Sequence, residues 1–140
     1  MNDLMGRVLA ACRGELMGLF PGLDQAFGWL PWTDGALFGT DGQKLYVPAS
    51  ITARYGENPG SVRRAYLHTL LHCLYLHIER PEKVEPDCWD LACDIFVETL
   101  LDGLSQPRLG EASPRKLEME AAFSGTPWHI LRNLENAPWK

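Results

Sequence analysis

Apolar side chains in the first twenty residues recur at the spacing of one face of an amphipathic helix. They stand at Leu4, Val8, Leu9, Cys12, Leu16 and Phe20. An α-helix with one buried face requires this repeat of three to four residues. Pro21 and Gly22 then interrupt the pattern, as a helix end requires. We therefore predict a helix over residues 3–20, followed to about residue 35 by an irregular connection whose aromatic side chains pack on the core.

Two short runs with apolar residues, at positions 36–40 and 44–47, flank a dipeptide that is typical of tight turns. The dipeptide is Asp41-Gly42, in which glycine supplies the positive φ angle that a hairpin turn needs. Pro48 follows the second run and closes it, because proline has no amide hydrogen for a strand ladder. The pattern predicts a short β-hairpin here.

Two longer helices are predicted in the middle of the chain. Ser61 follows Asn58-Pro-Gly and is expected to cap a helix over residues 62–79. A polar break at residues 81–86 separates this helix from the next. Asp87 is expected to cap the second helix, which spans residues 88–101 and has Gly103 near its end.

Two later positions carry start signals of short helices. At Ser113 and at Thr126 a hydroxyl residue precedes a proline, an arrangement that suits the first turn of a helix. Short helices are therefore expected near 114–123 and 127–135. All elements together predict an α+β fold that is mainly α-helical with a small β-hairpin, in a single domain over residues 1–140.

The composition narrows the classes of partner. Hydrophobic residues make up 46% of the 140 residues and charged residues 22%, close to the averages of soluble proteins. A net charge of −5 disfavours nucleic acid and anionic membranes as partners, because both attract a surplus of Lys and Arg. Apolar stretches such as residues 67–76 are too short to span a bilayer. Without a signal sequence, we expect a cytoplasmic protein whose four cysteines are reduced.

Two histidines one helical turn apart are the strongest sign of chemistry. His68 and His72 share a face of the predicted helix, so both imidazoles can point at one metal ion. Zinc proteases use such a pair, and a carboxylate next to the first histidine activates water. Thr69 occupies that position here. Taken alone, the pair is more typical of two partly buried histidines that are satisfied by their neighbours, and a third ligand would favour the metal site instead.

The third ligand is expected from the second long helix. A step of about 100° per residue places His77 roughly 140° around an unbroken helix from His72, so it should not converge with the pair. Asp90, Asp94 and Glu98 form an acidic stripe at four-residue spacing, which is typical of a solvated helix face. We predict Asp94 as the ligand, because its neighbours are apolar and a partly buried carboxylate needs a partner.

Three segments between residues 37 and 103 match the pattern of a known family in order. They are the hairpin at 40–46 with Pro48, the helix with His68, His72 and His77, and the segment 89–94 that reads Trp-Asp-Leu-Ala-Cys-Asp. The chain thereby resembles the metallopeptidase domain that precedes a von Willebrand factor A-like domain in many bacteria. The resemblance implies a zincin-like fold with zinc as cofactor, His68 and His72 as ligands, and Asp94 at the matching acidic position.

Three positions depart from the family pattern. Thr69 stands where the family has the glutamate of its His-Glu-x-x-His motif, while Asp90 and Glu98 stand where it has asparagines. Threonine does not accept a proton from water at neutral pH, so the usual general base is missing. The resemblance thus implies a zinc-binding domain with impaired catalysis. A substitute base is the alternative, and Glu98, one turn beyond Asp94, is the candidate for this catalytic role.

A function of a different class is a metal-free interaction or regulatory module on the same scaffold. It would bind a protein or peptide partner through the hairpin edge or the helices. Members of the family are associated with von Willebrand A-like domains and with AAA-type ATPases, so the resemblance implies partners of these two kinds.

Overall fold

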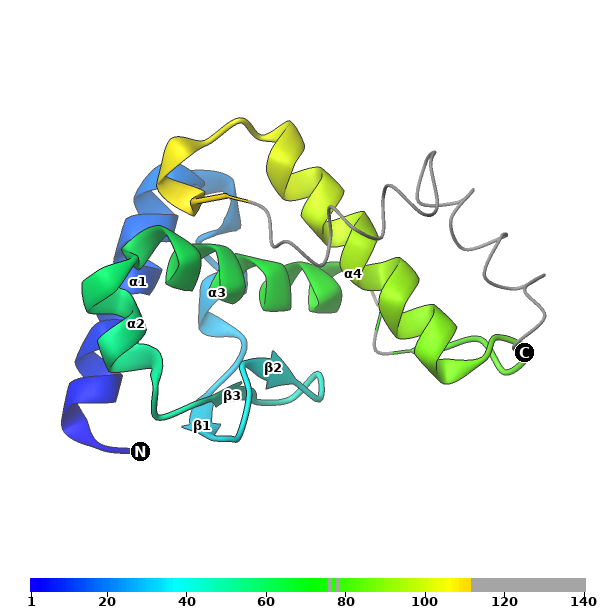
Figure 1. Cartoon of the computed structure of the whole chain (residues 1–140), viewed down its shortest axis with the longest axis horizontal. Helices are drawn as coiled ribbons and strands as arrows, with labels where there is room; N and C mark the ends of the chain where they lie inside the picture. The colour runs from blue at the N-terminus through cyan, green and yellow to red at the C-terminus, as the bar shows by residue number, and fades with distance from the viewer. Residues whose placement is uncertain (76, 78, 112–140) are drawn as a thin grey trace.

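The computed structural model describes residues 1–75, 77 and 79–111 of the chain (Figure 1). Within this part the chain forms four α-helices, three short 3-10 helices and one three-stranded sheet. The predicted combination of mainly α-helix with a small amount of β-structure is therefore confirmed. The helices expected near 114–123 and 127–135 lie outside the described residues.

The first helix, α1 (Asp3–Leu19), matches the predicted helix closely. Its cap is Asn2, whose Oδ1 accepts a hydrogen bond from the Met5 amide at 2.8 Å. The buried face of α1 consists of Met5, Leu9, Cys12 and Leu16. Leu4, which we assigned to this face, is 59% exposed. The assignment was wrong because Met5 lies one turn before Leu9 and fills that position instead.

The sheet has the strand order β1-β3-β2. Its strands are β1 (Trp32–Asp34), β2 (Gly39–Thr40) and β3 (Leu45–Val47). β2 and β3 are antiparallel, which confirms the hairpin, and Gly42 in its turn has a φ of 91°. β1 pairs with β3 in parallel inside the segment interpreted as irregular. The sequence did not reveal it because three residues between glycines and a proline are too few to show an alternating pattern.

The two long helices begin earlier than predicted, and for the same reason. In α3 (Pro59–Leu74) the cap is Asn58 rather than Ser61, and in α4 (Pro86–Gly103) it is Glu85 rather than Asp87. In both cases a proline occupies the first helical position, where its missing amide hydrogen costs nothing, and the residue before the proline becomes the cap. A short helix that we did not predict, α2 (Ile51–Glu57), precedes α3.

Helix α3 lies at the centre and is contacted by α1, α2 and α4 (Figure 1). The hydrophobic core includes Phe27, Leu67, Leu70, Val97 and Leu101. Figure 1 shows α4 passing the C-terminal half of α3, the half that carries both histidines, with the small sheet on another side of α3. In the described part of the chain, no helix combines the length and the apolar character that crossing a membrane requires.

The start of α3 packs closely against the backbone that follows α4. A Cβ atom at Gly60 would lie 2.9 Å from the Gly110 nitrogen and 3.2 Å from the Arg108 carbonyl oxygen. We expect Gly60→Ala to lower the free energy of unfolding by about 1–3 kcal/mol, because backbone atoms must move to admit the methyl group. Urea denaturation followed by circular dichroism measures this change.

Gly14→Ala is the matched control for this substitution. Gly14 lies inside α1, and an added Cβ there would meet nothing within 4 Å. Alanine is the better helix former, so we expect Gly14→Ala to raise the free energy of unfolding by about 0.5–1 kcal/mol. Effects of the same sign in both variants would contradict the close approach at Gly60.

Candidate metal centre

Helices α3 and α4 bring the three predicted ligands together at one point. His68 Nε2 and His72 Nε2 are 2.9 Å apart, and Asp94 Oδ1 lies 3.1 Å from the first and 2.9 Å from the second. The two histidines are one turn apart on α3, and Asp94 comes from the middle of α4. These three residues form a group that can hold a metal ion.

The spacing of the three ligand atoms fits a small tetrahedral cation. Bonds of about 2.0–2.1 Å to such an ion place its ligand atoms roughly 3.3 Å apart, close to the observed 2.9–3.1 Å. Hydrogen bonds alone do not satisfy this triangle. If both Nε2 atoms donate to Asp94, their two hydrogens face each other across the short nitrogen–nitrogen contact. A cation at the centre would satisfy all three atoms.

Each histidine of the pair also has a partner at its second ring nitrogen. His68 Nδ1 is 3.1 Å from Glu98 Oε1, and His72 Nδ1 is 3.0 Å from His77 Nδ1. A neutral imidazole that offers its Nε2 lone pair carries its proton on Nδ1, and that proton can be donated to these partners. Such outer partners fix the orientation and tautomer of metal-binding histidines. Glu98 and His77 are placed to act in this way.

His77 contacts His72, although we predicted an unbroken helix that would direct its side chain away. The predicted helix to residue 79 ends at Leu74, and the His77 amide then donates to the His72 carbonyl oxygen at 2.8 Å. The Trp89 indole donates to the His77 carbonyl oxygen at 2.7 Å, and the His77 ring packs edge-on against Trp89 and Phe96. The prediction of an unbroken helix to residue 79 was wrong, because the chain leaves the helix after Leu74 and packs against α4 without a glycine or proline. His77 still lies outside the group of three candidate ligands, as we expected.

The two carboxylates of the cluster favour a positive charge between them. Burial lowers the pKa of His68, but hydrogen bonds to the Asp94 and Glu98 carboxylates outweigh it and raise this pKa to about 9. Burial likewise raises the pKa of Asp94, yet its hydrogen bonds to His68 and His72 bring that pKa well below its usual range. Burial and the charge of His72 lower the pKa of His77 to about 4. The two carboxylates are therefore ionised, and a metal ion at the site would take the place of the proton that they stabilise on His68. His77 is neutral at pH 7, and its Nδ1 can accept a hydrogen bond from His72 Nδ1–H.

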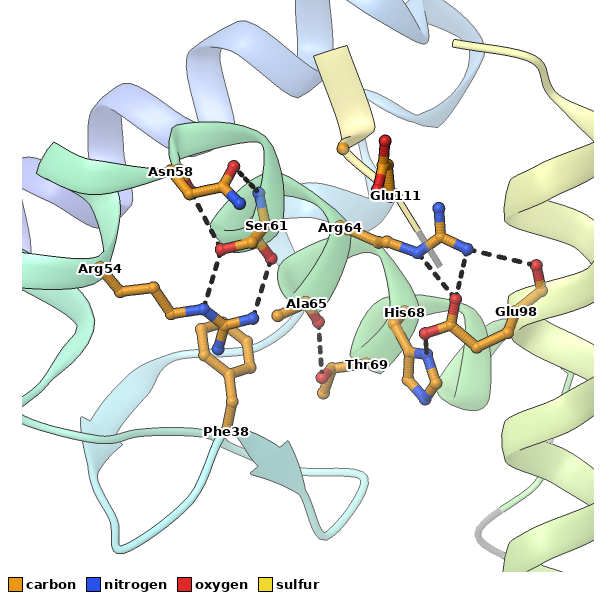
Figure 2. Close-up of a pocket in the computed structure, with 11 residues that line it drawn as sticks. Phe38, Arg54, Asn58, Ser61, Arg64, Ala65, His68, Thr69, Glu98 and Glu111 are labelled. Carbon is orange, nitrogen blue, oxygen red and sulfur yellow. Dashed lines mark hydrogen bonds and ion pairs between the residues drawn. The ribbon is translucent and has the colours of Figure 1, made fainter. Parts of the chain in front are cut away.

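Glu98 lies on the outer side of His68 and is engaged through both of its carboxylate oxygens. Oε1 contacts His68, and Oε2 accepts a hydrogen bond from Arg64 Nε at 2.7 Å (Figure 2). Arg64 also binds Asp102 Oδ1 at 2.8 Å and is only 6% exposed. Glu98 thus links a buried guanidinium to a histidine of the cluster. Its geometry suits the positioning of His68, and its role as a base stays a prediction.

A hollow of about 300 Å³ opens beside the three candidate ligands. Its other lining residues include Phe38, Thr40, Thr69, His77 and Asp90. Thr69 is 4% exposed, and its hydroxyl donates to the Ala65 carbonyl oxygen at 2.9 Å (Figure 2). Burial and the charge of Asp94 raise the pKa of Asp90. We did not predict Asp90 as a residue of the site, although its position four residues before Asp94 on the same helix face is the signal that indicates it.

The described fold and cluster define a mainly helical α/β protein with a group of two histidines and one aspartate that can hold a metal ion. Comparison of the chain with family models, with curated proteins and with solved structures finds no match in any of the three. Function is therefore inferred from the geometry of this cluster and of the hollows next to it.

Proposed function

We propose that this protein binds one zinc ion through His68, His72 and Asp94, in a zincin-like, metallopeptidase-like site whose hydrolytic step is impaired. The observation that carries the proposal is the triangle of three ligand atoms 2.9–3.1 Å apart. Two imidazoles and one carboxylate, with a fourth position open, form the ligand set of catalytic zinc sites. The outer partners Glu98 and His77 add the second feature of such sites.

Zinc in such a site supplies a Lewis acid that polarises a carbonyl group and activates water. The residues around the cluster lack the usual proton acceptor, because Thr69 stands beside His68 and directs its hydroxyl to the Ala65 carbonyl oxygen. Catalysis by Glu98, the predicted alternative, requires this carboxylate to release His68 and Arg64 first. We therefore favour binding of zinc, and of ligands close to it, over efficient hydrolysis.

Elemental analysis of the full chain tests the proposal directly. The protein is purified without chelators and without a histidine tag, and is analysed before and after incubation with one equivalent of zinc followed by gel filtration. We expect about one zinc per chain in the incubated sample. Zinc at background level in both samples would overturn the proposal and favour the metal-free interaction module.

Glu98→Gln should weaken zinc binding without removing a ligand. Glutamine retains the shape of the side chain but has no charge to orient His68 Nδ1–H, and loss of such a partner costs about 10- to 100-fold in metal affinity. Competition with a zinc-binding dye measures the change. Asp102→Asn is the control, because Asp102 binds the same Arg64 as Glu98 but lies one helical turn further along α4. We expect this control to bind zinc within about twofold of the parent, and equal losses in the two variants would contradict the positioning role.

A further inference from the structure

A second hollow, of about 630 Å³, runs along α3 and shares Phe38, His68 and Thr69 with the hollow at the metal cluster (Figure 2). This volume lies in the range of about 300–1,000 Å³ that is typical of ligand sites. Ser61, Ala65 and Thr69, spaced four residues apart on α3, also line it. We call this hollow the α3 groove. His68 lies toward one end of it and Arg54, next to Ser61, toward the other.

Of the described arginines that line the α3 groove, Arg54 is the one that no described carboxylate pairs with. Its Nε donates to Ser61 Oγ at 2.9 Å and its Nη2 donates to the Ser61 carbonyl oxygen at 3.2 Å, which fixes the guanidinium (Figure 2). No carboxylate among the described residues forms an ion pair with Arg54, and no partner is described for its Nη1. Arg64, the other arginine of the groove, is matched by Glu98 and Asp102.

The negative charges that line the α3 groove leave Arg54 available to an anion. Glu98 is engaged by Arg64 and His68. Glu111 also lines the groove, but Figure 2 shows its side chain well away from Arg54. A guanidinium held by neutral oxygens presents its remaining N–H groups in a planar fork that matches a carboxylate.

The length of the α3 groove sets the size of the ligand. Ser61 and His68 are seven residues apart, and a rise of 1.5 Å per residue separates them by about 10 Å along the helix. An extended peptide spans this distance with about three residues at roughly 3.3 Å each. A ligand with one end at the metal cluster can therefore place a group three residues away next to Arg54.

We propose that the α3 groove binds an extended peptide-like ligand of about three residues, with one end at the metal cluster and a carboxylate at Arg54. The inference rests on the proposed zinc site only for the first of these two ends. The carboxylate comes either from the C-terminus of a peptide or from an acidic side chain. Both sources present the same chemistry to the guanidinium.

Isothermal titration calorimetry on the zinc-loaded full chain tests the inference with three probes. Each is a trialanine-length peptide capped by a hydroxamate, a group that binds zinc. The first peptide has a free C-terminal carboxylate, and the second has a C-terminal carboxamide. The third also has a C-terminal carboxamide, but its last residue is glutamate. We expect one of the two carboxylate probes to bind about tenfold more tightly than the neutral probe. The tighter of the two identifies the source of the carboxylate.

Two arginine variants show whether Arg54 causes this preference. Arg54→Gln should bind the carboxylate and neutral probes equally. Arg7→Gln, which removes an equal charge from a 76% exposed position on α1, should keep the tenfold preference. Equal binding of all three probes by the parent protein would overturn the inference, as would a preference that survives in Arg54→Gln.

The neutral probe distinguishes failure of the zinc site from failure of the carboxylate site, because its binding depends on the metal and not on Arg54. Loss of its binding in His72→Ala reports on zinc alone. If the parent protein takes up no zinc, the metal-free protein is titrated with acetyl-trialanine as acid and as amide, followed by nitrogen-15 NMR. A preference for the acid that disappears in Arg54→Gln still supports the carboxylate site. No preference there overturns it.

Discussion

Replacing His72 with alanine is expected to abolish zinc binding under conditions in which the parent chain retains about one equivalent. His72 Nε2 lies 2.9 Å from both other ligand atoms, so its loss leaves only His68 and Asp94 to bind the ion. Structural zinc sites contribute about 10–16 kcal/mol in total, so one of three or four ligands accounts for about 4 kcal/mol, or roughly 1000-fold in affinity. Elemental analysis after gel filtration and competition with a chelating dye measure this loss.

His77→Ala is the control that distinguishes loss of a metal ligand, as in His72→Ala, from loss of a residue that only contacts a ligand. It removes the group that contacts His72 Nδ1 at 3.0 Å but leaves all three ligand atoms in place. We therefore expect a loss of only about tenfold. Far-ultraviolet circular dichroism confirms that both variants fold. A loss in His77→Ala as large as that in His72→Ala would show that His77 binds the metal directly, against the described geometry.

Local patterns were enough to predict the parts of the site that depend on one element. The spacing of His68 and His72 follows from helix periodicity, and an acidic stripe with apolar neighbours indicated Asp94. The hairpin, which includes Thr40 at the edge of the hollow, follows from Asp41-Gly42 and the runs beside it. In each case, the signal in the sequence lies within a few residues along the chain.

The parts that were not predicted depend on contacts between distant segments. α3 ends before His77, which contacts Trp89 and Phe96 of α4. No local signal in the sequence marks this end. The pairing of Arg64 with Glu98 joins residues 34 positions apart. Strand β1 is defined by a parallel partner that follows it by about a dozen residues. The predicted helix caps were wrong for another reason. Each helix start offers two possible capping residues, and the cap is the one directly before the proline.

Thr69→Glu is the substitution with the largest expected gain. Position 69 follows His68 on α3 and lines both the hollow at the cluster and the α3 groove. The threonine hydroxyl is held by the Ala65 carbonyl oxygen, whereas a glutamate is too long for that bond and must extend into the hollow of about 300 Å³. A carboxylate there can accept a proton beside the metal site. General base catalysis contributes about 100- to 10,000-fold, so we expect peptide hydrolysis to rise at least 100-fold above the parent.

Thr69→Gln makes this gain interpretable, because glutamine has the same size and polarity as glutamate but accepts no proton at neutral pH. Both variants are loaded with zinc, checked for one equivalent, and assayed with a pool of fluorogenic peptides. Activity in Thr69→Glu alone identifies the missing carboxylate as the cause of impairment. Activity in the parent at the level of Thr69→Glu would place the base elsewhere and return Glu98 to that role. Two zinc-loaded variants that are both inactive would mean that the site binds ligands without an inherited hydrolytic geometry.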